Sequence, residues 1–296
     1  MIPYEIKIRG KLVRVGQIDG DKFKFLEDPE PTLAYLRQQD RRPDIFTFME
    51  RLPNTEPRFD YPMEWDNLAV LTIPSFDHWW TKTLGFKARN KAKQAAKKGV
   101  VVREVPFDDA LVQGIWEIYN ETPVRQGRRF PHYGRSLESV RQVSRTFPDS
   151  SAFIGAFFED KLIGFIKLLW DDSRTQAGLL HIVSMIRHRD KAPTNALVAQ
   201  AVQSCADRGI PYLVYSNYSY GKKERSGLSD FKERNGFERV MLPRYYVPLT
   251  ALGRTALRFG LHHRASHYVP ESIAAKLRDA RYEWYKRRFP ASALDS

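Results

Sequence analysis

Ser226-Gly-Leu-Ser-Asp-Phe-Lys-Glu-Arg-Asn-Gly-Phe-Glu-Arg-Val240 is the stretch that decides the fold. Its first half predicts a short helix with one apolar ridge and a central lysine, Lys232, and Gly236 predicts the end of that helix. The preceding residues 212–218 predict a buried strand that ends in polar side chains, and a β-rich run follows the helix. We therefore expect Lys232 at the carboxyl end of a sheet, where open α/β sheets bind their ligands.

The composition indicates a folded, basic protein. Hydrophobic residues make up 42% of the 296 residues, which permits a sizeable core. The formal net charge of +13 favours anionic partners, namely nucleic acid, phosphorylated substrates or an acidic membrane surface. Cys205 is the only cysteine, which excludes a disulfide framework and a cysteine-based metal site, and we expect it to be a buried core thiol.

The sequence shows no signal for export or for a membrane span. The first residues lack a basic start followed by an apolar run. The most apolar run, residues 162–170, contains Lys167 and is too short to cross a bilayer. We therefore expect a cytoplasmic protein, and peripheral contact with the acidic inner surface of a membrane stays open.

The order of predicted elements divides the chain into three parts. Residues 52–62 hold three prolines in eleven positions, which predicts extended chain and a boundary near residue 65. We expect a partial N-terminal α/β segment over residues 1–65, an α/β domain over residues 66–250, and a basic helical tail over residues 251–296. Predicted strands cover residues 6–15, 22–25, 45–48, 68–73, 100–105, 152–158, 162–170, 178–186, 212–218 and 238–249. Predicted helices cover residues 31–39, 74–98, 108–119, 136–147 and 194–209, the last capped by Thr194, then the stretch after Ser226 and two helices in the tail.

This order predicts a mixed sheet with helices on both faces. Residues 152–158 and 162–170 are joined by a tight turn at Asp160-Lys161, so they are expected to pair as an antiparallel hairpin. A strand–helix–strand crossover follows over residues 178–218. An antiparallel meander followed by such a crossover resembles the GNAT acyltransferase superfamily.

Four segments are similar to the second domain of the FemABX-type peptidyltransferases, a GNAT-like family that moves aminoacyl groups onto amines. The most specific is Gly227-Leu-Ser-Asp-Phe-Lys with Asn235-Gly236-Phe237, which resembles the family's Gly-Leu-x-x-Phe-Lys box. The others are the basic helix of residues 86–100 that ends in Gly-Val, the segment of residues 118–127, and the crossover helix that starts at Ala192-Pro-Thr-Asn.

The resemblance implies aminoacyl-tRNA as the donor and tRNA as a partner, but two departures widen the choice. Residues 1–65 are too short for a complete first GNAT-like domain, and no long charged helical hairpin is visible. Acyl-CoA, such as acetyl-CoA, is therefore an alternative donor. GNAT enzymes hold the CoA pyrophosphate with a glycine-containing loop before the crossover helix, and residues 187–195 contain no glycine. The candidates for donor binding are the charged Arg187, Arg189 and Lys191, with Thr194 and Asn195 at the helix start.

Lys232 is the first candidate for catalysis, either stabilising the carbonyl oxygen during acyl transfer or holding a phosphate. A solvated helix lysine is the alternative. His181 is a candidate base or orienting group, with a core histidine as the alternative. At the end of residues 212–218, the candidates are proton donors (Tyr218 and Tyr220) and groups that orient substrate (Ser216 and Asn217), or else polar caps of a strand end.

Two basic segments are candidate binding surfaces. Arg125, Arg128 and Arg129, with His132 and Tyr133, form a loop whose guanidinium groups suit diphosphates and carboxylates, or an ordinary surface loop. Residues 82–98 carry seven Lys or Arg and no acid, which is typical of a surface for nucleic acid or membrane, or of a solvated face. No metal is expected, because the seven histidines are scattered apart from His262-His263 in the tail.

These features predict an N-acyltransferase that moves an acyl or aminoacyl group from an activated donor to an amine on a phosphate-bearing or cell-envelope acceptor. The attack is expected to be direct, because no cysteine or Ser–His–Asp arrangement suggests a covalent intermediate. The alternative is a non-catalytic module of the same fold that binds RNA or an anionic membrane through its basic surface.

Overall fold

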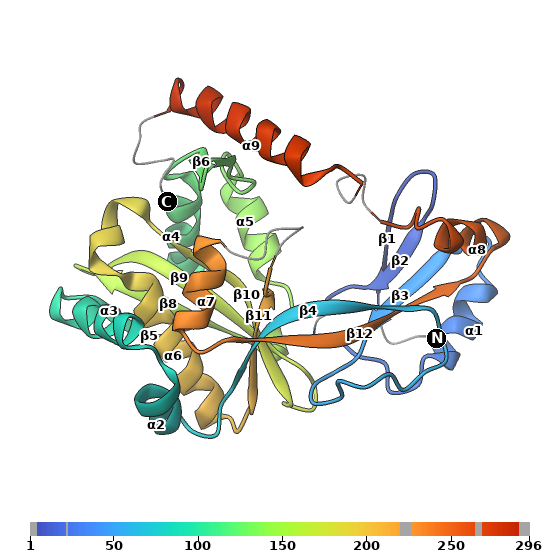
Figure 1. Cartoon of the computed structure of the whole chain (residues 1–296). Helices are drawn as coiled ribbons and strands as arrows, with labels where there is room; N and C mark the ends of the chain where they lie inside the picture. Colours follow the sequence, from blue (N-terminus) through green and yellow to red (C-terminus); the bar gives the residue numbers. More distant parts are fainter. Residues whose placement is uncertain (1–4, 22, 220–225, 264–267, 290–296) are drawn as a thin grey trace.

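The computed structural model describes residues 5–21, 23–219, 226–263 and 268–289, and it shows one large sheet with helices around it (Figure 1). Within these residues, ten strands form a mixed sheet in the order β1-β2-β3-β12-β4-β11-β10-β9-β8-β5. Two further short strands, β6 and β7, pair only with each other. The strands are β1 (Ile6–Arg9), β2 (Val15–Ile18), β3 (Ile45–Met49), β4 (Met63–Thr72), β5 (Val101–Val105), β6 (Val124–Arg125), β7 (Arg128–Arg129), β8 (Ser151–Phe158), β9 (Lys161–Trp170), β10 (Gln176–Ser184), β11 (Tyr212–Asn217) and β12 (Glu238–Pro248).

Local capping signals set the starts of several helices. Asp108 accepts a hydrogen bond from the Leu111 N–H at the start of α4, and Ser136 accepts one from the Ser139 N–H at the start of α5. The predicted pair of tail helices is also present. The helices are α1 (Glu30–Arg37), α2 (Phe76–His78), α3 (Phe86–Lys97), α4 (Asp109–Asn120), α5 (Leu137–Ser144), α6 (Pro193–Asp207), α7 (Gly227–Arg234), α8 (Ala251–Arg258) and α9 (Glu271–Lys286), with a π-turn at Trp79–Thr83 and 3₁₀ turns at Pro148–Ser150 and Ile186–Lys191.

Two long strands, β4 and β12, join the two halves of the sheet (Figure 1). They pair antiparallel with each other from Glu238↔Val70 to Tyr245↔Met63. The second half of β4 also pairs with β11, and the last residues of β12 pair with β3. The strands of the N-terminal segment therefore extend the same sheet that holds the β8–β11 region.

Helices cover both faces of the β8–β11 half, as predicted. The Phe165 ring in β9 contacts Tyr119 of α4, with ring centroids 5.8 Å apart. The neighbouring Gly164 faces Leu197 of α6. Because successive residues of a strand point to opposite faces, α4 and α6 lie on opposite sides of the sheet. Cys205, on α6, is fully buried in this core, as predicted.

The predicted single helix over residues 74–98 is wrong, because the chain breaks at Leu84-Gly85. Leu84 is extended, and Gly85 is the residue immediately before α3. The Gly85 N–H donates to the Arg234 carbonyl at 2.9 Å, and a Cβ on Gly85 would lie only 2.9 Å from that oxygen. The Trp79 indole donates to the Asn235 carbonyl at 2.9 Å. The break therefore lets the chain dock against the end of α7, which carries Lys232.

Three smaller predictions also differ from the structure. Residues 6–15 form two strands, β1 and the start of β2, because the chain turns back at Gly10 with φ of +91°. Among residues 22–25, the described residues 23–25 form no strand. Thr194 does not cap α6: Ala192 precedes the helix in a left-handed conformation, and the Thr194 hydroxyl instead lies 3.0 Å from the Ser184 hydroxyl.

Candidate active site

The parallel strands β10 and β11 separate at their carboxyl ends. They pair at three positions only, from Gln176↔Tyr212 to Gly178↔Val214. Beyond Gly178, β10 continues to Ser184 along β9, while β11 continues to Asn217, which pairs with Leu68 of β4. The carboxyl ends of diverging strands are where open α/β sheets place their ligands.

Lys232 lies at this carboxyl end, as predicted, and is fully buried. Its Nζ donates to the Asn217 carbonyl and lies 4.7 Å from the centroid of the Tyr215 ring. The ammonium is therefore not a solvated surface charge. It is held where β11 ends, between a carbonyl oxygen and the face of an aromatic ring.

Local chemistry sets the position of α7. Ser226 and Ser229 form a capping box, in which each side chain hydrogen-bonds the backbone N–H of the other residue. At the other end, Gly236 adopts φ of +84°, which favours glycine. Because both ends are set by these residues, Lys232 enters the core at a defined point of the helix.

The polar residues that end β11 take part in local contacts. Ser216 has φ of +52° within an irregularity of the β4–β11 pairing. The Tyr218 N–H donates to the Asn67 carbonyl at 3.2 Å, and the Arg239 guanidinium lies 5.2 Å from the centroid of the Tyr218 ring. Tyr220 lies outside the described residues. Strand-end contacts therefore involve Ser216, Asn217 and Tyr218, whose roles toward a substrate stay predictions.

His181 lies on β10, on the opposite face of the sheet from Lys232. His181 pairs with Lys167 of β9, and Gly178 pairs with Leu169, which is two residues further along β9 and on the same face as Lys167. His181 therefore shares a face with Gly178 and with Val214, the partner of Gly178 in β11. Lys232 lies over Tyr215, the residue next to Val214 and thus on the other face. The structure therefore does not bring these two candidates together on one side of the sheet.

The His181 imidazole lies against His132, which the sequence placed in the basic loop and did not connect with His181. The rings of His181 and His132 are 5.7 Å apart, and His132 stacks on Tyr119 at 4.4 Å. Burial first, and then the positive charges of His132, Lys167 and Arg135, lower the pKa of His181 to about 4. At neutral pH, His181 is an uncharged imidazole and a weak base, which fits an orienting role better than proton abstraction.

Glu121 is a residue to which sequence reasoning assigned no role. Its carboxylate accepts hydrogen bonds from the Ile186 N–H at 2.7 Å and the Arg187 N–H at 3.1 Å, immediately after β10. It also pairs with Arg125 at 3.1 Å, whose guanidinium donates to the Ser184 carbonyl at 2.7 Å. Arg125 thus ties α4 to the end of β10, and its predicted role in binding substrate stays a prediction.

The remaining predicted binding residues lie at the surface or pack locally. Lys191 lies 4.5 Å from the centroid of the Phe158 ring, and Thr194 and Asn195 occupy the first turn of α6. The first turn of α6 contains no acidic residue. The exposed members of the set are Arg128, Arg129, Tyr133, Arg187 and Arg189.

A hollow of about 620 Å³ lies near the amino end of β11, away from the carboxyl end where Lys232 lies. Its walls include Ile73, Asp77, Gln203 and Pro211, the last of which precedes β11. It therefore does not coincide with the separated carboxyl ends of β10 and β11. In the described part of the chain, no helix combines the length and apolar character needed to cross a membrane.

Comparison with known proteins shows the fold through solved structures only. No protein-family model and no curated protein matches the chain. Solved structures do match, and three of them share the fold of this chain over most of their length. The DUF2156 C-terminal domain named for a lysylphosphatidylglycerol synthetase of Agrobacterium fabrum has a TM-score of 0.58 and 11% identity, over 86% of this chain and 84% of that one. FemX has a TM-score of 0.56 and 9% identity, over 81% of this chain and 83% of that one.

A third structure, L-PGS from Bacillus licheniformis, gives a TM-score of 0.55 and 14% identity, over 85% of this chain and 83% of that one. At such identities the likeness concerns the fold. It extends over most of each chain.

Proposed function

We propose that the protein is an acyltransferase that moves an acyl or aminoacyl group from an activated donor to an amine of a phosphate-bearing or cell-envelope acceptor. The observation that carries the proposal is Lys232, a buried ammonium at the carboxyl end of β11 where β10 and β11 separate. It occupies the lysine position of the FemABX-like box in a fold shared with FemX.

In the proposed reaction, the acceptor amine attacks the donor carbonyl carbon, the bond to the donor's oxygen or sulfur breaks, and the amine loses a proton. Negative charge builds on the carbonyl oxygen, and a fixed cation in a water-poor site stabilises it. Lys232 supplies that cation, or holds a phosphate of donor or acceptor.

The donor is an anion, either acyl-CoA or aminoacyl-tRNA. Residues 187–195 contain no glycine, and Glu121 already occupies the Ile186 and Arg187 N–H groups after β10. A phosphate therefore depends on side-chain charge, for which the exposed Arg187 and Arg189 lie beside the start of α6.

The experiment starts with native mass spectrometry of the purified protein mixed with acetyl-CoA or with aminoacyl-tRNA, to find which ligand is retained. Transfer from the retained donor to amine acceptors is then measured in Lys232→Met, which keeps the volume and removes the charge. Loss of one preorganised electrostatic group costs about 10²–10³-fold in turnover. Lys93→Met, at an exposed lysine of α3, is the matched control.

Unchanged turnover in a folded Lys232→Met protein contradicts the assigned role. The non-catalytic alternative gains if neither donor is turned over and only charge reversal on α3 changes RNA or membrane binding. That helix buries Ala88, Ala92 and Ala95 and exposes its basic face, with Lys87, Lys91, Lys93 and Lys97.

A further inference from the structure

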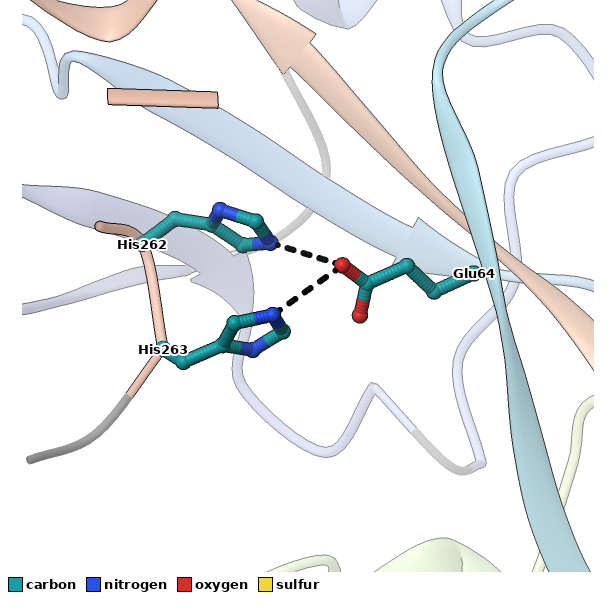
Figure 2. A group of neighbouring side chains, drawn as sticks. All are labelled: Glu64, His262 and His263. Carbon is teal, nitrogen blue, oxygen red and sulfur yellow. Dashed lines mark hydrogen bonds and ion pairs between the residues drawn. The ribbon is translucent and has the colours of Figure 1, made fainter. Parts of the chain in front are cut away.

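Glu64, His262 and His263 converge in the N-terminal half of the sheet (Figure 2). Glu64 lies in β4, and the two histidines follow α8, so 198 residues separate Glu64 from His262. The Nε2 atoms of both imidazoles face the same carboxylate oxygen, Oε1 of Glu64, at 3.0 Å from His262 and 3.1 Å from His263. We propose that these three side chains bind one divalent transition-metal ion, with Zn²⁺ as the best fit.

The distances suit a small tetrahedral ion. Zn²⁺ binds imidazole nitrogen and carboxylate oxygen at about 2.0–2.1 Å, which places neighbouring ligand atoms about 3.3 Å apart. The two nitrogen–oxygen separations are within a few tenths of an ångström of that value, and all three ligand atoms lie within 4.8 Å of one another. Small side-chain shifts therefore admit the ion, and three protein ligands leave a fourth position for water.

Packing holds the first ligand in place before an ion arrives. The His262 side chain is 4% exposed, and its ring lies edge-on to Tyr246 of β12 at 4.6 Å. The His263 ring lies 4.0 Å from that of His262. The Glu64 side chain is 43% exposed, so an ion can enter from solvent. Preorganised ligands with an open approach are the conditions that a metal site requires.

The neighbouring charges leave Glu64 without a fixed cationic partner from β12. Arg244 is its cross-strand neighbour, but the Arg244 guanidinium pairs with Asp21 and Asp66, each at 2.7 Å. Arg244 therefore does not compete with an ion for the Glu64 carboxylate. Soft sulfur ligands are absent from the cluster, and the two imidazoles favour Zn²⁺ over Mg²⁺ or Ca²⁺, which prefer oxygen.

One feature limits the expected affinity. The Nδ1 atom of His262 is buried and has no hydrogen-bond partner in the described chain. Metal-binding histidines normally donate this second nitrogen's proton to an acceptor, and loss of that acceptor costs about 10–100-fold in affinity. We therefore expect weaker binding than in a site with a complete outer shell.

The ion would fasten the chain after α8 to β4. That chain leads to α9, which lies over the other half of the molecule, where Tyr282 packs against Gly127 (Figure 1). The ion would therefore hold the tail at residues 262 and 263, between α8 and α9. An ion bound by residues far apart in the chain stabilises the folded state that brings them together.

The test uses tag-free, full-length protein that has been stripped with a chelator and is then titrated with Zn²⁺ by calorimetry. We expect one ion per chain in the wild type. His263→Ala and Glu64→Gln, both partly exposed positions, should lower the affinity by more than about 100-fold, because each removes a direct ligand. His78→Ala, at an exposed histidine of α2, is the control and should bind as the wild type does.

Circular dichroism verifies that each variant is folded. The wild type also provides a readout that needs no variant, because Co²⁺ bound in the same tetrahedral site gives intense visible absorption that Zn²⁺ displaces. Absence of stoichiometric Zn²⁺ binding in the wild type, absence of that Co²⁺ spectrum, or folded variants that bind like the wild type would each overturn the proposal.

Discussion

His181 and Lys167 are cross-strand partners whose ionisation is controlled by burial. Burial lowers the pKa of Lys167 to about 8 and that of His181 to about 4. Sequence alone marked His181 and passed over Lys167, which lies in an apolar run that predicts only a strand. The difference arises because the carbonyl groups that accept hydrogen bonds from Lys167 come from α5 and the turn after it. The sequence around Lys167 does not predict this contact.

The first prediction concerns the dependence of stability on pH. In the unfolded chain, a histidine titrates near about pH 6.5, so between this value and about pH 4 the unfolded state binds more protons than the native state at His181. The free energy of unfolding should therefore fall as pH is lowered through this window. His181→Asn should show a smaller fall between about pH 7 and about pH 5 in urea unfolding experiments.

The control for this measurement is His78→Asn, which changes an exposed histidine and should retain the wild-type fall. Equal decreases in the free energy of unfolding in His181→Asn and in the wild type would contradict the assignment of a neutral imidazole to His181 in the native state.

The second prediction is that Lys167→Met destabilises the protein. The fully buried Lys167 ammonium donates to the carbonyl oxygens of Ser144, at 2.8 Å, and Thr146. Methionine fills similar volume but leaves both carbonyls unpaired, which should lower the free energy of unfolding by about 1–3 kcal/mol. Lys161→Met, at the exposed start of the same strand, should change it by less than about 1 kcal/mol because its ion pair with Glu117 is at the surface. A Lys167→Met protein as stable as the Lys161→Met protein would refute the prediction.

At the scale of elements, close backbone contact positions α8. Gly253 lies within this helix, and a Cβ there would come within 1.9 Å of the Asp44 carbonyl oxygen, just before β3. The Thr250 hydroxyl that caps α8 also donates to the Asp44 carboxylate at 2.9 Å. Helix and strand therefore approach through a glycine, which explains how the tail docks on the N-terminal half.

The third prediction follows from this contact. In an exposed helix, replacing glycine with alanine stabilises by about 0.5–1 kcal/mol. In α8 the clash with backbone reverses the sign, and Gly253→Ala should lower the free energy of unfolding by about 1–3 kcal/mol. Gly227→Ala in α7 is the matched control, because nothing lies within 4 Å of the added carbon. Thermal unfolding of both variants gives the comparison, and stabilisation by Gly253→Ala would show that the contact is not tight.

At the scale of the whole molecule, the N-terminal segment and the larger part share one sheet. Residues 244–248 of β12 pair with β3, and the Tyr245 ring lies 5.0 Å from that of Phe48. The division at residue 65 stays a prediction from composition. The pairing of β3 with β12 indicates that the two parts depend on each other for a complete core.

The fourth prediction tests this dependence. A chain of residues 63–296 should lack the cooperative unfolding transition of the full chain, because β12 loses its β3 partner and Tyr245 loses its buried surroundings. Deletion of residues 271–296 is the control, since α9 is largely exposed, and a cooperative transition should remain. Circular dichroism during heating measures both. A cooperative transition in residues 63–296 would establish an independent domain.

Local sequence alone determined the β8–β9 turn, the starts of α4 and α5, and the end of α7 before Gly236, because each depends on neighbours within a few positions. Hydrophobic periodicity then placed helices on both faces of a mixed sheet. These signals also located Lys232 at a strand end, since the strand and the helix are consecutive.

Only the tertiary structure decided which distant groups meet. It broke the long helix at Gly85 against α7, placed Glu121 on the N–H groups after β10, and set His181 and Lys232 on opposite faces. It also brought Glu64 to His262 and His263. These contacts join residues far apart in the chain, and their formation depends on how whole elements pack, which a short-range pattern does not contain.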